Sequence, residues 1–135
     1  MIYLLDSNTC IAYLNGKAPA VLRRLNQTPS ADVSVCSVVK AELYFGAKRS
    51  SNPQSERLKL DQFFAPYVSL PFDDRAADLY GDIRAHLVSL GNTIGPNDLL
   101  IAAIAHSHNL VLVTHNTQEF SRVPGLQIED WEAGP

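Results

Sequence analysis

The sequence contains no long apolar run and no basic leader. No hydrophobic stretch approaches the roughly 20 residues that a membrane-spanning helix needs. The first residues, Met1 to Asp6, lack the basic start and the cleavage site of a signal peptide. We therefore expect a protein that has no membrane segment and works in the cytoplasm.

Cysteine and net positive charge are also scarce. The only two cysteines, Cys10 and Cys36, lie in apolar patterns without a Cys or His at metal-ligand spacing, so both are interpreted as reduced core residues and no zinc site is expected. The formal net charge of −3 argues against binding nucleic acid through bulk basicity. A nucleic-acid enzyme remains compatible with it, because two divalent cations held by clustered acids would shift the charge to about +1.

The rest of the composition is that of an ordinary globular chain, with 46% hydrophobic and 19% charged residues among 135. This length predicts one domain spanning residues 1–135. Short apolar runs alternate with amphipathic segments, and no repeat or linker interrupts them. Strands are expected at residues 2–5, 33–36, 67–70, 110–113 and 126–128, and helices at 7–14, 19–26, 37–47, 54–64, 74–90 and 98–105. The alternation predicts a three-layer α/β/α domain with a mainly parallel central sheet.

The helix at 98–105 is the centre of this arrangement. Gly95 and Pro96 mark a loop, Asn97 is predicted as the N-cap, and Asp98 then lies in the first turn. The residues behind Asp98 are apolar all round, which predicts a buried helix with a carboxylate at its start. Acids are also favoured at helix starts by the macrodipole, so capping alone could explain Asp98.

Three other segments carry polar side chains whose oxygens could lie near Asp98 in the predicted fold. Asp6 directly follows the first apolar strand, at the carboxyl edge where open α/β folds build their sites. Glu42 lies three residues after Val39 and three before Phe45, which puts it on the inward stripe of its helix or at a solvated edge of that stripe. The stretch from Asn116 to Glu119 follows the strand at 110–113 in the position that Asp6 has after the first strand.

This set of residues predicts a divalent-metal site. Clustered acids repel one another, and cations are the common remedy. Because the ligands are hard oxygens without Cys or a convincing His, Mg²⁺ or Mn²⁺ is expected rather than Zn²⁺. Such a site activates water and neutralises a phosphodiester, so we interpret the chain as a metal-dependent nuclease. Two alternatives stay open: a non-catalytic, Mg-binding α/β signalling module, and a nuclease specific for DNA.

Four motifs carry a resemblance to a known family. They are Leu4-Leu5-Asp6-Ser7-Asn8, Ala41-Glu42-Leu43-Tyr44-Phe45-Gly46-Ala47, Ile94-Gly95-Pro96-Asn97-Asp98-Leu99-Leu100 and Val113-Thr114-His115-Asn116-Thr117-Gln118-Glu119-Phe120. In this order and spacing they resemble the motifs of PIN-domain ribonucleases, and more narrowly of the VapC toxins of bacterial toxin–antitoxin pairs. The likeness covers essentially the whole chain and implies a PIN-like fold.

The resemblance also implies roles for individual residues. Asp6, Glu42 and Asp98 match the three acidic metal-site positions of the family, and Asn8 matches a polar residue that orients the first of them. The fourth position is either Asn116 or Glu119. We assign Glu119 as the fourth acid and Asn116 as a neutral ligand or water-orienting group, and Thr114 as a supporting residue. His115 has no evident triad partner, so it is interpreted as an ordinary loop histidine.

The same resemblance implies the biological setting. VapC toxins are Mg²⁺- or Mn²⁺-dependent endoribonucleases, and the ones this chain resembles cut initiator tRNA in the anticodon loop to inhibit translation. RNA, and specifically tRNA, is therefore the expected substrate. A VapB-like antitoxin is the expected inhibitor, and a homodimer is the expected oligomer.

Overall fold

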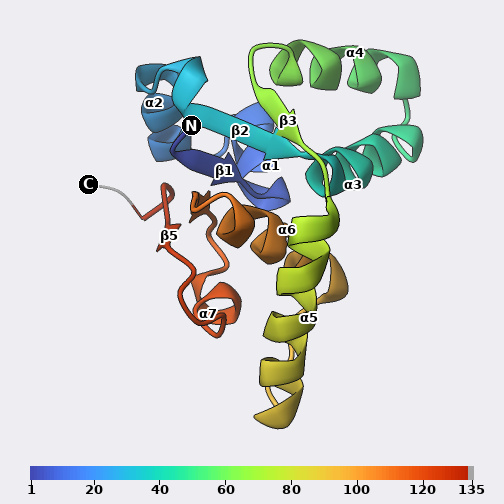
Figure 1. Ribbon diagram of the computed structural model, residues 1–135. Helices are drawn as coiled ribbons and strands as arrows, with labels where there is room; N and C mark the ends of the chain where they lie inside the picture. The colour runs from blue at the N-terminus through green and yellow to red at the C-terminus, as the bar shows by residue number, and fades with distance from the viewer. Residues whose placement is uncertain (134–135) are drawn as a thin grey trace.

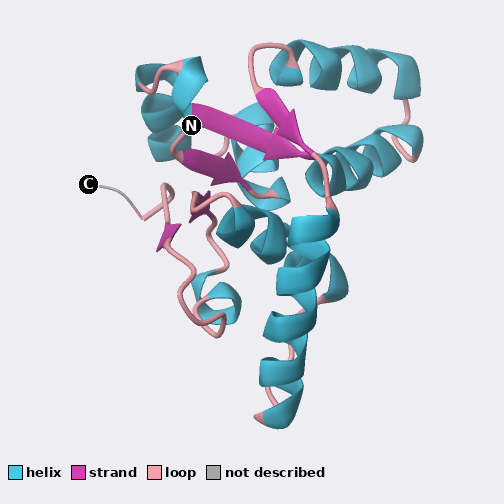
Figure 2. Ribbon diagram, viewed as in Figure 1, coloured by secondary structure: helices cyan, strands magenta, loops and turns pink. Residues whose placement is uncertain are grey.

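The computed structural model describes residues 1–133 and contains a five-stranded sheet in the order β3-β2-β1-β4-β5. Every neighbouring pair of strands is parallel. Figure 2 shows the sheet surrounded by helices. The strands are β1 (Tyr3–Leu5), β2 (Val33–Cys36), β3 (Val68–Leu70), β4 (Val111–Val113) and β5 (Ile128–Glu129). This architecture confirms the predicted α/β/α fold with a parallel central sheet.

Helices occupy most of the remaining chain. They are α1 (Ser7–Asn15), α2 (Pro19–Gln27), α3 (Ser37–Lys48), α4 (Pro53–Phe64), α5 (Asp74–Ser89), α6 (Pro96–Ser107) and α7 (Thr117–Phe120), with a short 3₁₀ helix at Ser30–Asp32. Within residues 1–133, none of these helices is long and apolar enough to cross a membrane.

The strand order reverses at β1. The chain proceeds from β1 outward to β2 and β3, and then crosses back to place β4 and β5 on the other side of β1. Because such crossovers are right-handed, α1 to α4 cover one face of the sheet and α5 to α7 the other. β1 and β4 lie side by side in register, with Leu5 opposite Val113, so the residues that follow these two strands emerge together. Ligand sites in open α/β sheets form at such a switch point.

The core lies on both sides of the sheet, and its part between the sheet and α6 positions the start of α6. Leu4, Leu5 and Leu112 of the central strands are fully buried. In α6 the residues from Ile101 to Ala105 are buried on every side, as predicted for this helix, and α5 packs along it as a long rod (Figure 1). This packing fixes the start of α6 relative to the ends of β1 and β4.

Local boundaries differ from the predictions in several places. α6 begins at Pro96 with Gly95 as its N-cap, so the predicted cap at Asn97 is wrong. The reason is that the fixed φ of proline suits the first helical position, where no hydrogen bond is lost. Asp98 still lies in the first turn. Similarly, α3 begins at Ser37 with Cys36 as its N-cap, and Leu90, the last residue of the helix predicted at 74–90, lies just beyond the end of α5 and is 61% exposed.

Candidate metal centre

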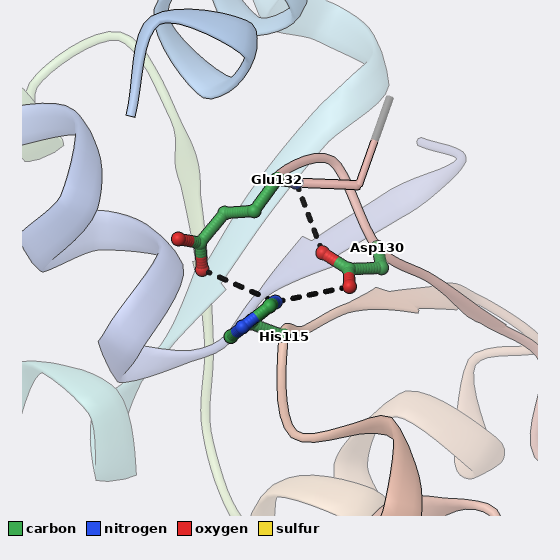
Figure 3. A group of neighbouring side chains, drawn as sticks. All are labelled: His115, Asp130 and Glu132. Carbon is green, nitrogen blue, oxygen red and sulfur yellow. Dashed lines mark hydrogen bonds and ion pairs between the residues drawn. The ribbon is translucent and has the colours of Figure 1, made fainter. Parts of the chain in front are cut away.

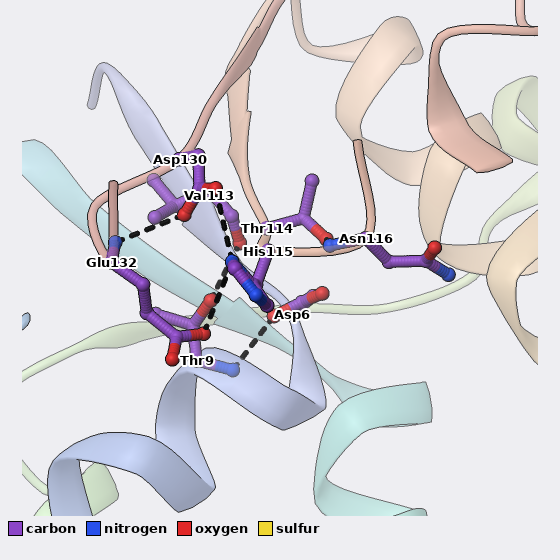
Figure 4. Close-up of polar contacts among 8 residues, drawn as sticks. All are labelled: Asp6, Thr9, Val113, Thr114, His115, Asn116, Asp130 and Glu132. Atoms are coloured by element: carbon purple, nitrogen blue, oxygen red, sulfur yellow. Dashed lines mark hydrogen bonds and ion pairs between the residues drawn. The ribbon is translucent and has the colours of Figure 1, made fainter. Parts of the chain in front are cut away.

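Asp6 lies at the carboxyl end of β1 and is the N-cap residue of α1. Its Oδ1 accepts a 2.8 Å hydrogen bond from the Thr9 N–H, which satisfies one of the free donors of the first helical turn. The Thr9 hydroxyl donates to the Val113 carbonyl oxygen at 3.1 Å, which joins α1 to the end of β4 (Figure 4). Only 4% of Asp6 is exposed, and this burial raises the pKa of its carboxyl, although hydrogen bonds from Thr114 and Thr9 act in the opposite direction.

Thr114 and Asn116 extend the same edge from β4. The buried Thr114 hydroxyl is hydrogen-bonded to the Asp6 carboxyl and accepts a 2.9 Å bond from the Asn116 N–H. A hydroxyl can donate and accept at the same time, so one side chain links both residues. The turn that follows β4 is thereby fixed to the turn that follows β1.

Glu42 reaches this edge from α3 and is half-buried. Its Oε1 accepts a 2.6 Å hydrogen bond from the Ser7 hydroxyl. Glu42 also lines an open cleft of about 540 Å³ between α3 and α6, together with Asn97 and Phe45. Glu42 therefore lies at a solvated edge of its helix, the alternative that the sequence left open, and Phe45, which was assigned to the same inward stripe, is 62% exposed.

Asp98 and Glu119 form a pair at the start of α6. One oxygen of Glu119 accepts a 2.6 Å bond from the Gly95 N–H, and the other accepts a 2.8 Å bond from the Asn116 side-chain amide. A Cβ added at Gly95 would lie 3.4 Å from Glu119 Oε1 and 3.7 Å from Asp98 Oδ2, so the missing side chain leaves room for both carboxyl groups. Glu119 thereby joins α7 to the loop before α6.

The pKa values of the two carboxyls are shifted in opposite directions. Burial raises the pKa of Asp98, and a hydrogen bond to Glu119 and the negative charges of Glu119, Asp6 and Glu42 raise it further, to about 7. Burial also disfavours the charge on Glu119, but hydrogen bonds from Gly95, Asn116 and Asp98 outweigh it and lower the pKa of Glu119. Asp98 is therefore the proton donor of the pair and Glu119 the acceptor.

The four predicted acids come from four separate segments of the chain and lie near enough for the charges of Glu119, Asp6 and Glu42 to raise the pKa of Asp98. Within residues 1–133, no Lys, Arg or His side chain lies within ion-pair distance of Asp6, Glu42, Asp98 or Glu119. Asp6, Glu42 and Glu119 instead accept hydrogen bonds from neutral donors. The candidate ligands are therefore carboxylate oxygens with the Asn116 amide beside them. Because the negative charges of these carboxylates repel one another, the set fits a hard divalent cation.

Two supporting contacts differ from the sequence assignment. Asn8 was expected to orient Asp6, but it is exposed in the first turn of α1, and no hydrogen bond within residues 1–133 joins the two side chains. The N-cap geometry selects the Thr9 N–H instead. Ser7, which supports Glu42, was not singled out from the sequence. Its contact spans 35 positions, and only its place directly after Asp6 pointed to it.

A second polar cluster lies on the other side of the turn that follows β4. His115 Nδ1 lies 3.0 Å from Asp130 Oδ2 and 3.7 Å from Glu132 Oε2 (Figure 3). Hydrogen bonding to Asp130 and the two negative charges raise the pKa of His115. His115 lies in the loop after β4, as the sequence indicated, but its partners lie 15 and 17 positions further along the chain and were not identified from the sequence.

The His115 cluster is a weaker candidate for a hard cation than the four acids. Its three ligand atoms lie within 4.8 Å of one another, close enough to surround an ion. However, the imidazole already neutralises the two carboxylates in part, and a nitrogen ligand suits softer metals. The acid cluster at the ends of β1 and β4 is therefore the better candidate centre for Mg²⁺ or Mn²⁺.

The family model described as "PIN domain" matches residues 3–126, which include Asp6, Glu42, Asp98 and Glu119. Among curated proteins, the chain is 38% identical over 129 residues to the "tRNA(fMet)-specific endonuclease VapC" of Salmonella typhimurium. This alignment covers 96% of the chain and 97% of that protein. It is 35% identical over 133 residues to "Ribonuclease VapC2" of Rickettsia felis, covering 98% of the chain and 99% of that protein.

Solved structures give the same picture. The VapC-type chain in the DNA-bound VapBC structure from Salmonella typhimurium superimposes with a TM-score of 0.92 at 37% identity, covering 97% of this chain and 98% of that one. The corresponding chain of VapBC2 from Rickettsia felis, bound to a promoter DNA fragment, superimposes with a TM-score of 0.90 at 34% identity. It covers 97% of this chain and 99% of that one.

Proposed function

The chain belongs to the PIN-domain family and, within it, to the VapC ribonucleases, and from this membership we propose that it is a divalent-metal-dependent endoribonuclease that cleaves tRNA. The observation that carries the proposal is the convergence of Asp6, Glu42, Asp98 and Glu119 without a cationic partner among residues 1–133. We take residues 1–135 to be one catalytic domain that acts in the cytoplasm.

Asp6, Glu42 and Asp98 would hold the metal, with Glu119 as the fourth acid and Asn116 beside it. When bound, Mg²⁺ or Mn²⁺ would supply an activated water and charge neutralisation at the scissile phosphodiester. The protein's own contribution is orientation. Thr9 and Thr114 fix the Asp6 carboxylate, and the hydrogen bonds from Gly95 and Asn116 keep Glu119 ionised. Holding ligands in place before substrate arrives avoids reorganisation during the reaction.

The proposed substrate and partners follow the relatives. The Salmonella relative carries the name of a tRNA(fMet)-specific endonuclease, so initiator tRNA is the first substrate to test. Single-stranded loops are the parts of structured RNA whose bases and backbone a small protein can reach, which suits an anticodon loop. Because two structural relatives were solved as VapBC assemblies, we propose a VapB-like antitoxin as the inhibitor and a homodimer as the active form.

The direct test is a cleavage assay on the purified protein. We expect cleavage of a panel of tRNAs in Mg²⁺ or Mn²⁺, with initiator tRNA cut first, and no cleavage in EDTA. Asp98→Asn is the matched control, because it removes one charge and keeps the size of the side chain. Undiminished cleavage in chelator would overturn the metal dependence. Preferential cleavage of duplex DNA over every tRNA would identify the protein as a DNA nuclease.

A further inference from the structure

The turn from Thr114 to Asn116 supports two acids of the candidate centre. Thr114 is hydrogen-bonded to Asp6, and the Asn116 side chain donates to Glu119 at 2.8 Å. His115 lies between these two residues, and its Nδ1 meets Asp130 and Glu132 of the C-terminal segment (Figure 4). A contact that holds His115 in place therefore also holds the turn that carries Thr114 and Asn116.

The C-terminal segment is firmly anchored where His115 meets it. Trp131 is only 3% exposed, its ring packs edge-on against Tyr3 at 5.2 Å between centroids, and the Arg24 guanidinium lies 5.0 Å from its ring centre. Asp130 uses its second oxygen to accept a 2.9 Å bond from the Glu132 N–H. Asp130 is thus held on a rigid support, with its other oxygen free to receive the imidazole.

The bond to Asp130 defines which ring nitrogen matters. A carboxylate only accepts, so Nδ1 must carry the proton that is donated to Asp130 at 3.0 Å. This holds for the neutral and for the charged imidazole alike. The contact therefore acts as a fixed brace between the turn after β4 and the segment after β5, whatever the charge on the ring.

We propose that His115 is a positioning residue that acts on the reaction through Thr114 and Asn116, by holding their turn against Asp130. The inference rests on the proposed nuclease function. The His115 side chain is 61% exposed, so the ion pair adds at most about 1 kcal/mol to the free energy of unfolding. A displacement of about 1 Å at a reacting centre can nevertheless lower turnover about 100-fold. The brace should affect rate far more than stability.

Substitutions at His115 separate its two ring nitrogens. His115→Asn places an amide N–H close to the position of Nδ1, His115→Gln places one close to Nε2, and His115→Ala removes both. We expect His115→Asn to retain kcat within about threefold, and His115→Gln and His115→Ala to lower kcat about 10- to 100-fold with KM unchanged. All three should melt within a few degrees of the parent. His86→Ala, at an exposed histidine of α5, is the control and should match the parent.

A second measurement does not depend on activity. The backbone amides of Asn116 and Gly95 report on the supporting contacts, because the first donates to the Thr114 hydroxyl and the second to Glu119. We expect their NMR signals to shift in His115→Ala and His115→Gln but to stay near their parent positions in His115→Asn.

Several outcomes would overturn the inference. His115→Gln active with His115→Asn inactive would show that Nε2 acts directly on substrate or metal. A raised KM with unchanged kcat would make His115 an RNA-binding residue. Unchanged amide signals in His115→Ala would show that no positioning occurs. A parent protein that cleaves no RNA would overturn the proposed function instead, and the amide signals would still decide whether His115 holds the turn.

Discussion

At the scale of single residues, the most unusual group is the Asp98 carboxyl. It lies at a helix N-terminus, where the macrodipole stabilises a negative charge, yet its pKa is raised to about 7. Burial and the neighbouring carboxylates therefore outweigh the dipole. A capping role alone would give the opposite direction of shift, so the surroundings of Asp98 distinguish it from the capping acid that the sequence left as an alternative.

This pKa predicts how stability depends on pH in chelator. The folded state of Asp98 binds its proton up to about pH 7, whereas the unfolded chain releases it near 3.8, so the free energy of unfolding should fall as pH rises through this window. The lowered pKa of Glu119 changes stability only below its ordinary value of 4.5. Because Asp98 is half-exposed, we expect the parent to lose about 1–2 kcal/mol between pH 5 and 8 after allowance for solvent screening.

Asp98→Asn should remove most of this loss, because the amide still donates toward Glu119 but cannot ionise. Denaturant unfolding of both proteins in EDTA at pH 5, 6, 7 and 8 measures the difference. The raised pKa of His115 contributes nearly equally to both proteins, whereas the charges of Asp6 and Asp98 interact, so the comparison measures the Asp98 carboxyl together with its effect on Asp6. Equal pH slopes for parent and variant would contradict the prediction and return Asp98 to the role of a simple cap.

At the scale of elements, the sequence predicted the architecture better than the contacts. The spacing of apolar residues and the residue composition identified every strand and long helix to within a few residues. Continuous apolar runs such as Ile101 to Ala105 are compatible only with buried elements. They also placed Asp6 at a strand end and Asp98 at a helix start. The contacts of Ser7, His115 and Asp130 could not be predicted, because each partner lies on another element and no local pattern encodes the distance between them.

The tie between α6 and α7 gives the prediction at this scale. Glu119 joins the two elements through Gly95 and adds the fourth charge to the centre. Glu119→Gln can still accept from the Gly95 N–H, so the fold should persist while the metal concentration needed for half-maximal cleavage rises about 10-fold or more. Excess Mn²⁺ should restore part of the rate. The same titration on Asn116→Ala should show a smaller change, because that variant keeps every carboxylate.

The contact between Asn116 and Glu119 also limits which substitutions can serve as controls. An aspartate at position 116 would place a second carboxylate where the Asn116 amide now donates to Glu119 at 2.8 Å, so Asn116→Asp is not a neutral control without metal. The titration decides the fourth ligand. If Glu119→Gln kept the parent's rate and metal dependence, the centre would run on three acids with Asn116 beside them.

At the scale of the whole molecule, the candidate centre brings together residues from elements that are spread along the chain from β1 to α7. Asp6 follows β1, Glu42 lies on α3, and Asp98 and Glu119 begin the two last helices, α6 and α7. Their mutual repulsion therefore acts between elements and opposes the closure of the fold, rather than straining a single loop. A cation bound among them should stabilise the entire domain, because the unfolded chain cannot assemble the site.

Thermal unfolding with increasing Mn²⁺ tests this coupling. A ligand at about 100 times its Kd adds about 2.7 kcal/mol to the free energy of unfolding, which corresponds to a rise in Tm of several degrees for a domain of this size. Asp98→Asn should lose most of the rise. Glu132→Gln should keep it, because Glu132 belongs to the His115 cluster and leaves the four acids intact. The reverse pattern, with the rise lost in Glu132→Gln and kept in Asp98→Asn, would move the metal centre from the ends of β1 and β4 to His115, Asp130 and Glu132.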